Sequence, residues 1–346
     1  MKVVWCTGSS LDLRRPQPVW MQGVSSSLFV GGLGSFVFLS PETGGVVSEL
    51  AEPGTQPGCD LFPWTQARLL SNRRRGLHEV YAVSVRGELG AFVDVKCERI
   101  PKEARPPTVK STCPSAGWAW ILWTTSMPDY TIVGQHLACI DDTGVARWEQ
   151  TRSSDWISYV AGLSDGRSLV ASSANRRVEL LSAAGESLDV AALPAPAGRL
   201  GCKENGMLFF ARCRDVGLVV GTITPLANVR PFPDPDLRWG FAAVRGDQLY
   251  VMATGWVAAL NEDLTCRFKT PCQLRDEDNQ IQSPPCFLGD RMYVGSNNGS
   301  LWCYDCRTGE LLDRLEFPRL IPESPATDGE HIFVGCGDGK VYCVQP

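Results

Sequence analysis

The last sixty residues of the chain contain one pattern twice, forty residues apart. One copy reads Met292-Tyr-Val-Gly-Ser-Asn-Asn-Gly-Ser-Leu-Trp-Cys-Tyr-Asp305, and the other reads Ile332-Phe-Val-Gly-Cys-Gly-Asp-Gly-Lys-Val-Tyr-Cys-Val-Gln345. At this offset a valine, two glycines and a cysteine are identical, and two aromatic positions are alike. A repeat of this length is typical of solenoids, propellers and arrays. We therefore expect the chain to fold from copies of one unit.

Each copy holds two short β-rich runs around a glycine-containing turn, which is the signature of a hairpin. A Ser-Pro pair precedes each copy, and a further apolar run, Leu311 to Phe317, follows the first copy. The unit therefore reads as four strands, A to D. Strand C carries apolar or aromatic side chains on both faces, so its sheet is expected to be covered on both sides. Four-stranded sheets packed face to face around an axis meet this requirement.

Weaker copies of the unit precede the clear ones, at intervals of 37 to 54 residues. We predict an all-β fold, a β-propeller of four-stranded antiparallel blades, with eight blades and seven as the alternative. A single propeller domain is expected to span residues 1–346. The predicted ends of strand C are Ser40, Asp94, Asp141, Ser182, Thr224, Asn261, Asp305 and Gln345.

The two ends of the sequence complement each other. The chain stops just after strand C of the last unit, so that unit lacks its fourth strand. A short β-type run, Lys2-Val-Val-Trp-Cys6, precedes the first unit's own strand A at Pro18–Met21. We predict that residues 2–6 complete the C-terminal blade and close the ring, which would leave only short, protected outer edges.

Composition and charge restrict the function. The formal net charge of −5 gives no sign of nucleic-acid binding. The N-terminus lacks the apolar core of a signal peptide and no run of 18 apolar residues exists, so we expect no membrane span and a cytoplasmic, monomeric protein. Equivalent positions on neighbouring blades are roughly 10 Å apart, and a disulfide needs Cα atoms within about 7 Å. The fourteen cysteines are therefore expected to be reduced packing residues.

Residues with catalytic or metal-binding chemistry are few. His78, His136 and His331 are the three histidines, and none is close in sequence to a nucleophile or a second ligand. Cys303-x-x-Cys306 has no second pair at zinc-ribbon spacing and begins in a predicted strand, which favours packing. We expect no catalytic residue, no metal and no cofactor. Distant residues that assemble at the centre of the ring are the alternative.

The repeat resembles a known family. Its motifs are Ser-Pro-x-x-x-x-Gly-Asp-x-x-Tyr-Val-Gly-Ser over residues 283–296 and Gly-x-Leu-x-x-x-Asp-x-x-Thr-Gly-Glu over residues 299–310. These motifs are similar to the pyrroloquinoline-quinone-type (PQQ-like) β-propeller repeat, which implies the propeller fold. The cysteine-rich sequence of residues 334–343 looks most like the propeller of β-alanine-activating, aminoadipate-semialdehyde-dehydrogenase-like proteins. Quinoprotein dehydrogenases of this family carry two adjacent cysteines at the cofactor, which this chain lacks.

The resemblance and the loop lengths together favour a protein-interaction scaffold that binds a protein partner. The longest connections all join strand D to the next strand A, at 51–63, 98–116, 229–238 and 271–283. Insertions in repeat proteins collect on the working face. The alternative is an enzyme or small-ligand binder with its site at the central channel. The residues expected to contact the partner are Lys102, Arg105, Phe232, Arg238, Trp239 and Arg275.

Overall fold

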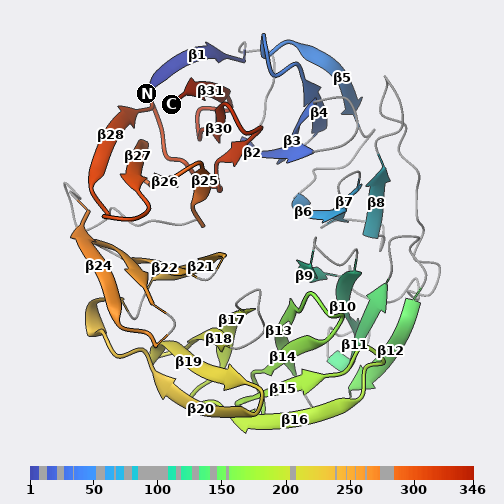
Figure 1. The fold of residues 1–346 in the computed structure, drawn as a ribbon. Helices are drawn as coiled ribbons and strands as arrows, with labels where there is room; N and C mark the ends of the chain where they lie inside the picture. Colours follow the sequence, from blue (N-terminus) through green and yellow to red (C-terminus); the bar gives the residue numbers. More distant parts are fainter. Residues whose placement is uncertain are drawn as a thin grey trace. The chain divides into compact units, whose positions relative to one another are not determined.

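The structure is a computed structural model, and its described residues are almost entirely β-strand (Figure 1). Among them, helix is limited to the three residues of the 3₁₀ turn η2 (Pro235–Leu237). The all-β prediction is confirmed. The structure describes residues 1–7, 14–21, 27–33, 35–51, 59–65, 68–73, 80–84, 108–113, 118–126, 132–140, 146–152, 156–202, 208–237, 240–246, 248–253, 255–261, 263–272 and 284–346.

The chain divides into two compact units, and unit 1 comprises Met1–Leu61, Val85–Gly90 and Gly240–Pro346. Four antiparallel four-stranded sheets belong to it. Their strands, in hydrogen-bonded order, are β2 (Arg14–Met21), β3 (Ser27–Leu33), β4 (Ser35–Leu39) and β5 (Val46–Ala51); β21 (Phe241–Arg245), β22 (Gln248–Ala253), β23 (Trp256–Leu260) and β24 (Cys266–Pro271); β25 (Cys286–Leu288), β26 (Arg291–Gly295), β27 (Ser300–Asp305) and β28 (Leu311–Glu316); and β1 (Lys2–Cys6), β31 (Val341–Gln345), β30 (Ile332–Gly335) and β29 (Ala326–Thr327).

Unit 2 comprises Phe62–Ser84 and Ala91–Trp239. It holds three antiparallel four-stranded sheets, while a three-stranded sheet begins at the unit boundary. The strands are β9 (Thr108–Cys113), β10 (Trp118–Ser126), β11 (Ile132–Ile140) and β12 (Ala146–Arg152); β13 (Ile157–Gly162), β14 (Ser168–Ser172), β15 (Arg177–Leu181) and β16 (Ser187–Ala192); β17 (Ala197–Cys202), β18 (Leu208–Cys213), β19 (Gly217–Ile223) and β20 (Leu226–Pro231); and β6 (Cys59–Thr65), β7 (Arg68–Arg73) and β8 (Val80–Ser84).

The repeat predicted the third strand of most sheets well. Each predicted end of strand C in the described residues is either the last residue of β4, β15, β19, β23, β27 or β31, or the residue just after it. The predictions at Asp94 and Asp141 lie outside the described residues. The two clear copies also share one turn geometry, because Gly299 and Gly339 both adopt a φ of 85°. That left-handed conformation favours glycine, which explains why glycine occurs at both positions.

The N-terminal strand completes the C-terminal sheet. β1 pairs antiparallel with β31, with Lys2 opposite Gln345 and Trp5 opposite Cys343. The Trp5 indole donates a hydrogen bond of 2.7 Å to the carbonyl oxygen of Pro41, and its ring packs 6.0 Å from the Phe333 ring. Figure 1 shows the two chain ends side by side at this sheet. The predicted pairing of residues 2–6 is therefore confirmed, whereas ring closure, the blade count and the single domain stay predictions.

The glycine that ends the second strand in both clear copies is explained by close packing. A Cβ built at Gly335 would lie 1.8 Å from the backbone carbonyl oxygen of Pro16, on the neighbouring strand β2. A Cβ at Gly295 would lie 2.6 Å from the side chain of Ile321. Neither site admits a side chain without movement of its neighbours, so these glycines allow adjacent segments of unit 1 to approach closely.

Two connections predicted from loop length are partly strand. In the segment 51–63, residues 59–63 belong to β6. β9 lies inside the segment 98–116 and pairs with β10, with Thr112 opposite Ala119. The prediction of an uninterrupted D–A connection in these two segments is wrong. The strand Thr-Val-Lys-Ser-Thr-Cys is mostly polar, so it lacks the apolar pattern by which the other strands were found.

A buried acidic side chain stabilises unit 2. Glu179 on β15 is 6% exposed and accepts a hydrogen bond of 2.6 Å from Arg152 Nη1, and Arg177 Nη2 lies 3.8 Å from it. Burial raises the pKa of Glu179, but hydrogen bonds from Arg152 and Ser187 and the charges of the two arginines outweigh it, so the pKa is lowered overall. The folded state therefore favours the carboxylate.

We predict that Glu179→Gln lowers the free energy of unfolding at pH 7 by about 2 kcal/mol, between the effects of exposed and fully buried pairs. A lowered folded pKa means that the contribution is complete above the unfolded pKa of about 4.3 and is lost as pH falls through the folded pKa. Urea denaturation between pH 7 and pH 3.5 should therefore show a smaller difference at the acidic end. Glu149→Gln, an exposed change on β12, is the control. A difference independent of pH would contradict the prediction.

Candidate functional site

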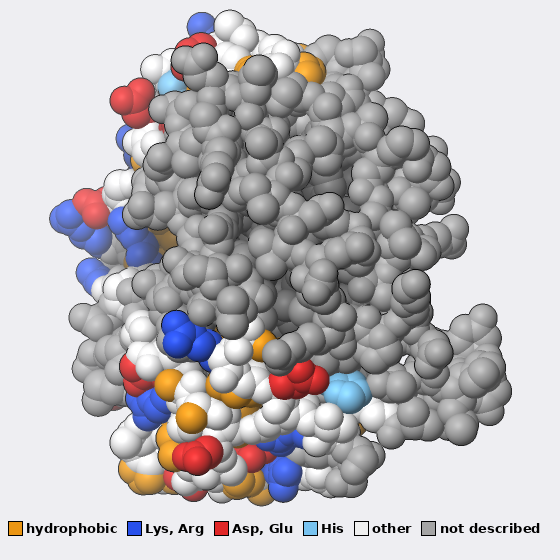
Figure 2. Space-filling view, turned by 90° about the vertical axis from the view of Figure 1, so that its right-hand side faces the viewer, with side chains coloured by type: hydrophobic (Ala, Val, Ile, Leu, Met, Phe, Trp, Pro, Cys, Tyr) orange, Lys and Arg blue, Asp and Glu red, His pale blue; other side chains and the backbone are white. Residues whose placement is uncertain are grey.

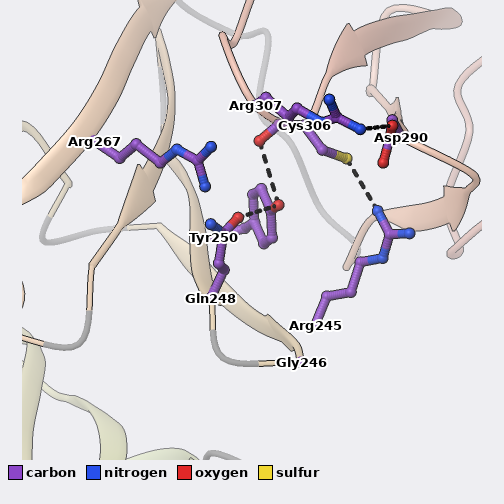
Figure 3. Close-up of a pocket in the computed structure, with 8 residues that line it drawn as sticks. All are labelled: Arg245, Gly246, Gln248, Tyr250, Arg267, Asp290, Cys306 and Arg307. Carbon is purple, nitrogen blue, oxygen red and sulfur yellow. Dashed lines mark hydrogen bonds and ion pairs between the residues drawn. The ribbon is translucent and has the colours of Figure 1, made fainter.

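A pocket of about 390 Å³ lies in unit 1, where two neighbouring sheets contribute the ends of their strands and turns. One sheet is β21 to β24 and the other is β25 to β28. The lining residues come from the A–B and C–D turn ends of both sheets, which is the opposite end from the D–A connections. The residues that line it are Arg245, Gly246, Gln248, Tyr250, Arg267, Asp290, Cys306 and Arg307 (Figure 3).

Regular strands fix most of the lining side chains. Arg245 ends β21, and Arg267 is the second residue of β24. Gln248 and Tyr250 are two apart on β22, so their side chains project from the same face of the sheet. Figure 3 shows these two between Arg267 on one side and Arg245 on the other. Strands hold side chains more rigidly than mobile loops do, so the pocket is preformed.

The turn after β27 supplies the remaining wall. The backbone N–H of Cys306 donates 2.8 Å to the carbonyl oxygen of Asp290, which ties this turn to the turn before β26. Asp305 accepts hydrogen bonds of 2.8 Å from the backbone N–H groups of Thr308 and Arg307, and these bonds lower the pKa of Asp305. The Arg307 guanidinium pairs with the Asp290 carboxylate at the rim. The turn is therefore well ordered by its own hydrogen bonds.

Two potentially reactive groups in the pocket are held neutral. Tyr250 is 2% exposed, and its hydroxyl lies 2.8 Å from Gln248 Oε1 and 3.3 Å from the carbonyl oxygen of Cys306. Burial raises the pKa of Tyr250 to about 12. Burial also raises the pKa of the Cys306 thiol. At neutral pH both groups stay protonated, so neither is activated as a nucleophile or poised as a general base.

The pocket carries more positive than negative charge. Arg245 Nη1 donates a hydrogen bond of 3.4 Å to Cys306 Sγ, and its guanidinium lies 5.2 Å from the centre of the Phe287 ring. A neutral thiol is a weak acceptor and a ring offers only its quadrupole, so neither neutralises the cation. Arg267 is exposed and, within the described residues, no carboxylate pairs with it. Of the three arginines, only Arg307 has a carboxylate partner there, Asp290.

The residues predicted from the loops do not form this pocket. Phe232 is fully buried, and its backbone N–H donates 2.8 Å to the Leu218 carbonyl oxygen, so its side chain is not available to a partner at the surface. The other five predicted contacts lie outside the described residues. These are Lys102, Arg105, Arg238, Trp239 and Arg275.

The histidines and cysteines also lie away from a catalytic arrangement in the described residues. His331 Nδ1 lies 3.1 Å from Asp328 Oδ2, and His136 Nδ1 lies 3.0 Å from Thr151 Oγ1; neither lines the pocket. His78 lies outside the described residues. Eleven of the cysteines, among them Cys303 and Cys343, form no disulfide in the described residues, and the reduced state of the cysteines stays a prediction.

Sequence reasoning missed the three pocket arginines, although a signal for them exists. Arg245 lies at an A–B turn and Arg267 just after a C–D turn of the same sheet, and Arg307 lies at a C–D turn of the next sheet along the chain. In an antiparallel sheet these turns share one end. Basic residues that recur at such turns in consecutive units could therefore have been read as one cluster, rather than as separate solvated turns.

The described side chains in the lower part of Figure 2 do not form a patch of one charge type. Figure 2 views the side of the molecule on which β12 lies, and the coloured side chains in its lower part mix basic, acidic and hydrophobic types. Across the described ranges, no three metal-binding side chains come together. No helix among the residues that the structure describes is long and apolar enough to cross a membrane.

Comparison with known proteins supports the fold. The PQQ_2 family model, described as outer membrane protein assembly factor BamB, matches residues 215–346. Sqt1 of Saccharomyces cerevisiae has a TM-score of 0.72 at 11% identity, covering 99% of this chain and 98% of that chain. Chaetomium thermophilum Sqt1, bound to the N-terminus of ribosomal protein L10, has a TM-score of 0.67 at 13% identity, covering 99% of each chain. BamB from Moraxella catarrhalis has a TM-score of 0.62 at 12% identity, covering 100% of this chain and 99% of that chain.

These likenesses concern the fold, because every identity is far below the level at which function transfers. No curated protein matches the sequence. The family match falls on the part of the chain where the repeat motifs are clearest. The likeness to the propeller of β-alanine-activating proteins gains no support from these comparisons. The chain therefore has a β-propeller fold, with PQQ-like repeats recognised over residues 215–346.

Proposed function

We propose that this protein is a non-enzymatic interaction propeller that binds a protein partner in the cytoplasm. The observation that carries the proposal is the arginine-lined pocket, where the β21–β24 sheet presents Arg245 and Arg267 without a carboxylate partner in the described residues. Uncompensated cations on a rigid frame are typical of a recognition site. One of the proteins with a similar fold, Sqt1, is seen with a segment of ribosomal protein L10 bound. That observation supports a binding role for the fold.

Binding is favoured over catalysis by the state of the pocket's own groups. A catalytic pocket needs a group whose pKa is matched to proton transfer or nucleophilic attack near neutral pH. Tyr250 and Cys306 have raised pKa values instead. The hydroxyl of Tyr250 is also engaged with Gln248 and the backbone of Cys306. The pocket can therefore hold an anionic group but offers no activated group to react with it.

The proposal includes the single-domain and monomeric organisation predicted from the sequence. It also keeps the D–A connections, with Lys102, Arg105, Arg238, Trp239 and Arg275, as a second contact surface for a large partner. The pocket and the D–A connections lie at opposite ends of the strands. Substitutions in the pocket would weaken binding of a partner at the first end, and substitutions in the D–A connections would weaken binding of a partner at the second. The two surfaces can therefore be tested separately.

The test is affinity capture from native cells with the full-length chain as bait, followed by reconstitution of the recovered protein with the purified chain. A stable complex of fixed stoichiometry in light scattering on a sizing column is the expected result. If no protein is recovered above a bait-free control, or if the recovered protein does not rebind after purification, the interaction role is rejected. The alternative function, binding of a free small anion, would then be tested by calorimetry.

A further inference from the structure

We infer that the arginine-lined pocket receives a carboxylate side chain from a short acidic segment of the partner. This inference rests on the proposed function and specifies the chemistry of its partner. It starts from the charge in the pocket, where three guanidinium groups face one carboxylate, that of Asp290. Because Asp290 is paired with Arg307, no carboxylate of the described residues occupies the guanidinium groups of Arg245 and Arg267, and these remain for a ligand.

The donors in the pocket suit a carboxylate. A guanidinium presents a planar fork of N–H groups that matches the two oxygens of a carboxylate. Gln248 Oε1 accepts the hydrogen bond of the Tyr250 hydroxyl, which leaves the Gln248 amide nitrogen as a donor. Figure 3 shows the guanidinium of Arg267 directed towards Gln248 and Tyr250, with Arg245 across the pocket. An anion placed between them would find donors from three strands of one sheet, β21, β22 and β24.

A singly charged group is favoured over a phosphate dianion. Asp290 lies on the rim of the same pocket, so it repels an anion, and the repulsion grows with the ligand's charge. Arg245 and Arg267 have no carboxylate partner among the described residues, and their two positive charges can balance one or two carboxylates. Phosphate sites commonly use a larger cluster of donors. A glutamate or aspartate side chain is therefore the better match.

A peptide is also favoured over a nucleic acid. The chain has a formal net charge of −5, so an extended polyanion would meet repulsion outside the pocket. A short acidic segment can place one carboxylate in the cavity of about 390 Å³ and leave the rest of its charge in solvent. The pocket is thus a local positive site on a negative protein, which confers specificity for a small acidic feature.

The experiment uses the full-length chain and three labelled peptides of equal length in fluorescence anisotropy at low salt. One has a core of glutamates and aspartates, the second has glutamines and asparagines in their place, and the third has phosphoserine in a neutral background. We expect the acidic peptide to bind, the amide peptide to bind at least tenfold more weakly, and binding of the acidic peptide to weaken as salt rises. Binding of the phosphoserine peptide alone, or equal binding of the acidic and amide peptides, would overturn the inference.

The variants locate the binding site. Arg245→Gln and Arg267→Gln should each weaken binding of the acidic peptide about tenfold, and together at least thirtyfold, because each removes a charged donor. Arg319→Gln removes an exposed arginine in the same unit, after β28 at the opposite end of the strands, and should change binding less than twofold. Unchanged thermal midpoints would show that the variants remain folded. Peptide binding that survives the double substitution would overturn the inference.

Failure of this inference can be told apart from failure of the proposed function. If the captured partner binds the double variant as tightly as the unsubstituted chain, the interaction role stands and the pocket assignment falls. If no protein partner is recovered but the acidic peptide binds in an Arg245-dependent way, the carboxylate chemistry stands and the proposed protein partner falls.

Discussion

A chain that lacks residues 1–6 will unfold with a free energy lower by about 5 kcal/mol than that of the full-length chain. The loss has two parts. Trp5 packs against Phe333 and donates a hydrogen bond to Pro41, and removal of a large packed aromatic costs about 3 to 5 kcal/mol. The hydrogen bonds between β1 and β31 contribute about 1 kcal/mol each, and Val3 packs against a core cluster of unit 1.

The measurement is urea denaturation followed by circular dichroism, with two controls. Val4→Ala changes a side chain that is 49% exposed on the same strand and should cost less than about 0.5 kcal/mol. A synthetic peptide of residues 1–7, added in trans, should pair with the free edge of β31 and raise the midpoint of the truncated chain, whereas a scrambled peptide should not. A truncated chain as stable as the full-length one would refute the idea that this strand completes the sheet.

The elements found from sequence are those encoded within one repeat. The turns at Gly299 and Gly339, and the doubly apolar strands after them, are local features, and they predicted the third strands to within one residue. β9 was missed because its polar sequence resembles a connection. Phe232 was misjudged because a phenylalanine between two prolines in a connection reads as exposed, whereas its side chain is buried. Burial of a side chain in a connection depends on neighbours that the local sequence does not reveal.

The pocket shows the same limit for function. Its three arginines are spread over more than sixty residues of sequence and are brought together only when two sheets pack side by side. Local patterns indicated three polar turns, and they could not show that Arg245 would face a thiol and a ring rather than a carboxylate. The sequence thus predicts the frame that positions the site. The balance of charge within the site follows from the packing of two sheets of unit 1.

That packing depends on the core directly beside the pocket. Tyr250 and Cys306, which line the pocket, belong to one buried cluster with Trp302 of β27. Trp302 is fully buried, between its strand neighbours Val294 and Arg314. Its indole Nε1 has no hydrogen-bond partner among the described residues. The side chain therefore stabilises the wall of the pocket through packing and the burial of apolar surface, at the expense of one unsatisfied donor.

This arrangement predicts that Trp302→Ala lowers the free energy of unfolding by about 3 to 5 kcal/mol, while Trp302→Phe costs less than half as much. Phenylalanine fills most of the space and removes an N–H group that makes no hydrogen bond. The removal of this unsatisfied donor is favourable and compensates for part of the packing energy that the smaller ring loses. Leu312→Ala, on the neighbouring strand at a side chain 45% exposed, should cost less than about 1 kcal/mol. Urea denaturation of the three variants provides the comparison. If Trp302→Phe lowered the free energy of unfolding as much as Trp302→Ala, the indole N–H would contribute to stability, and the prediction would be wrong.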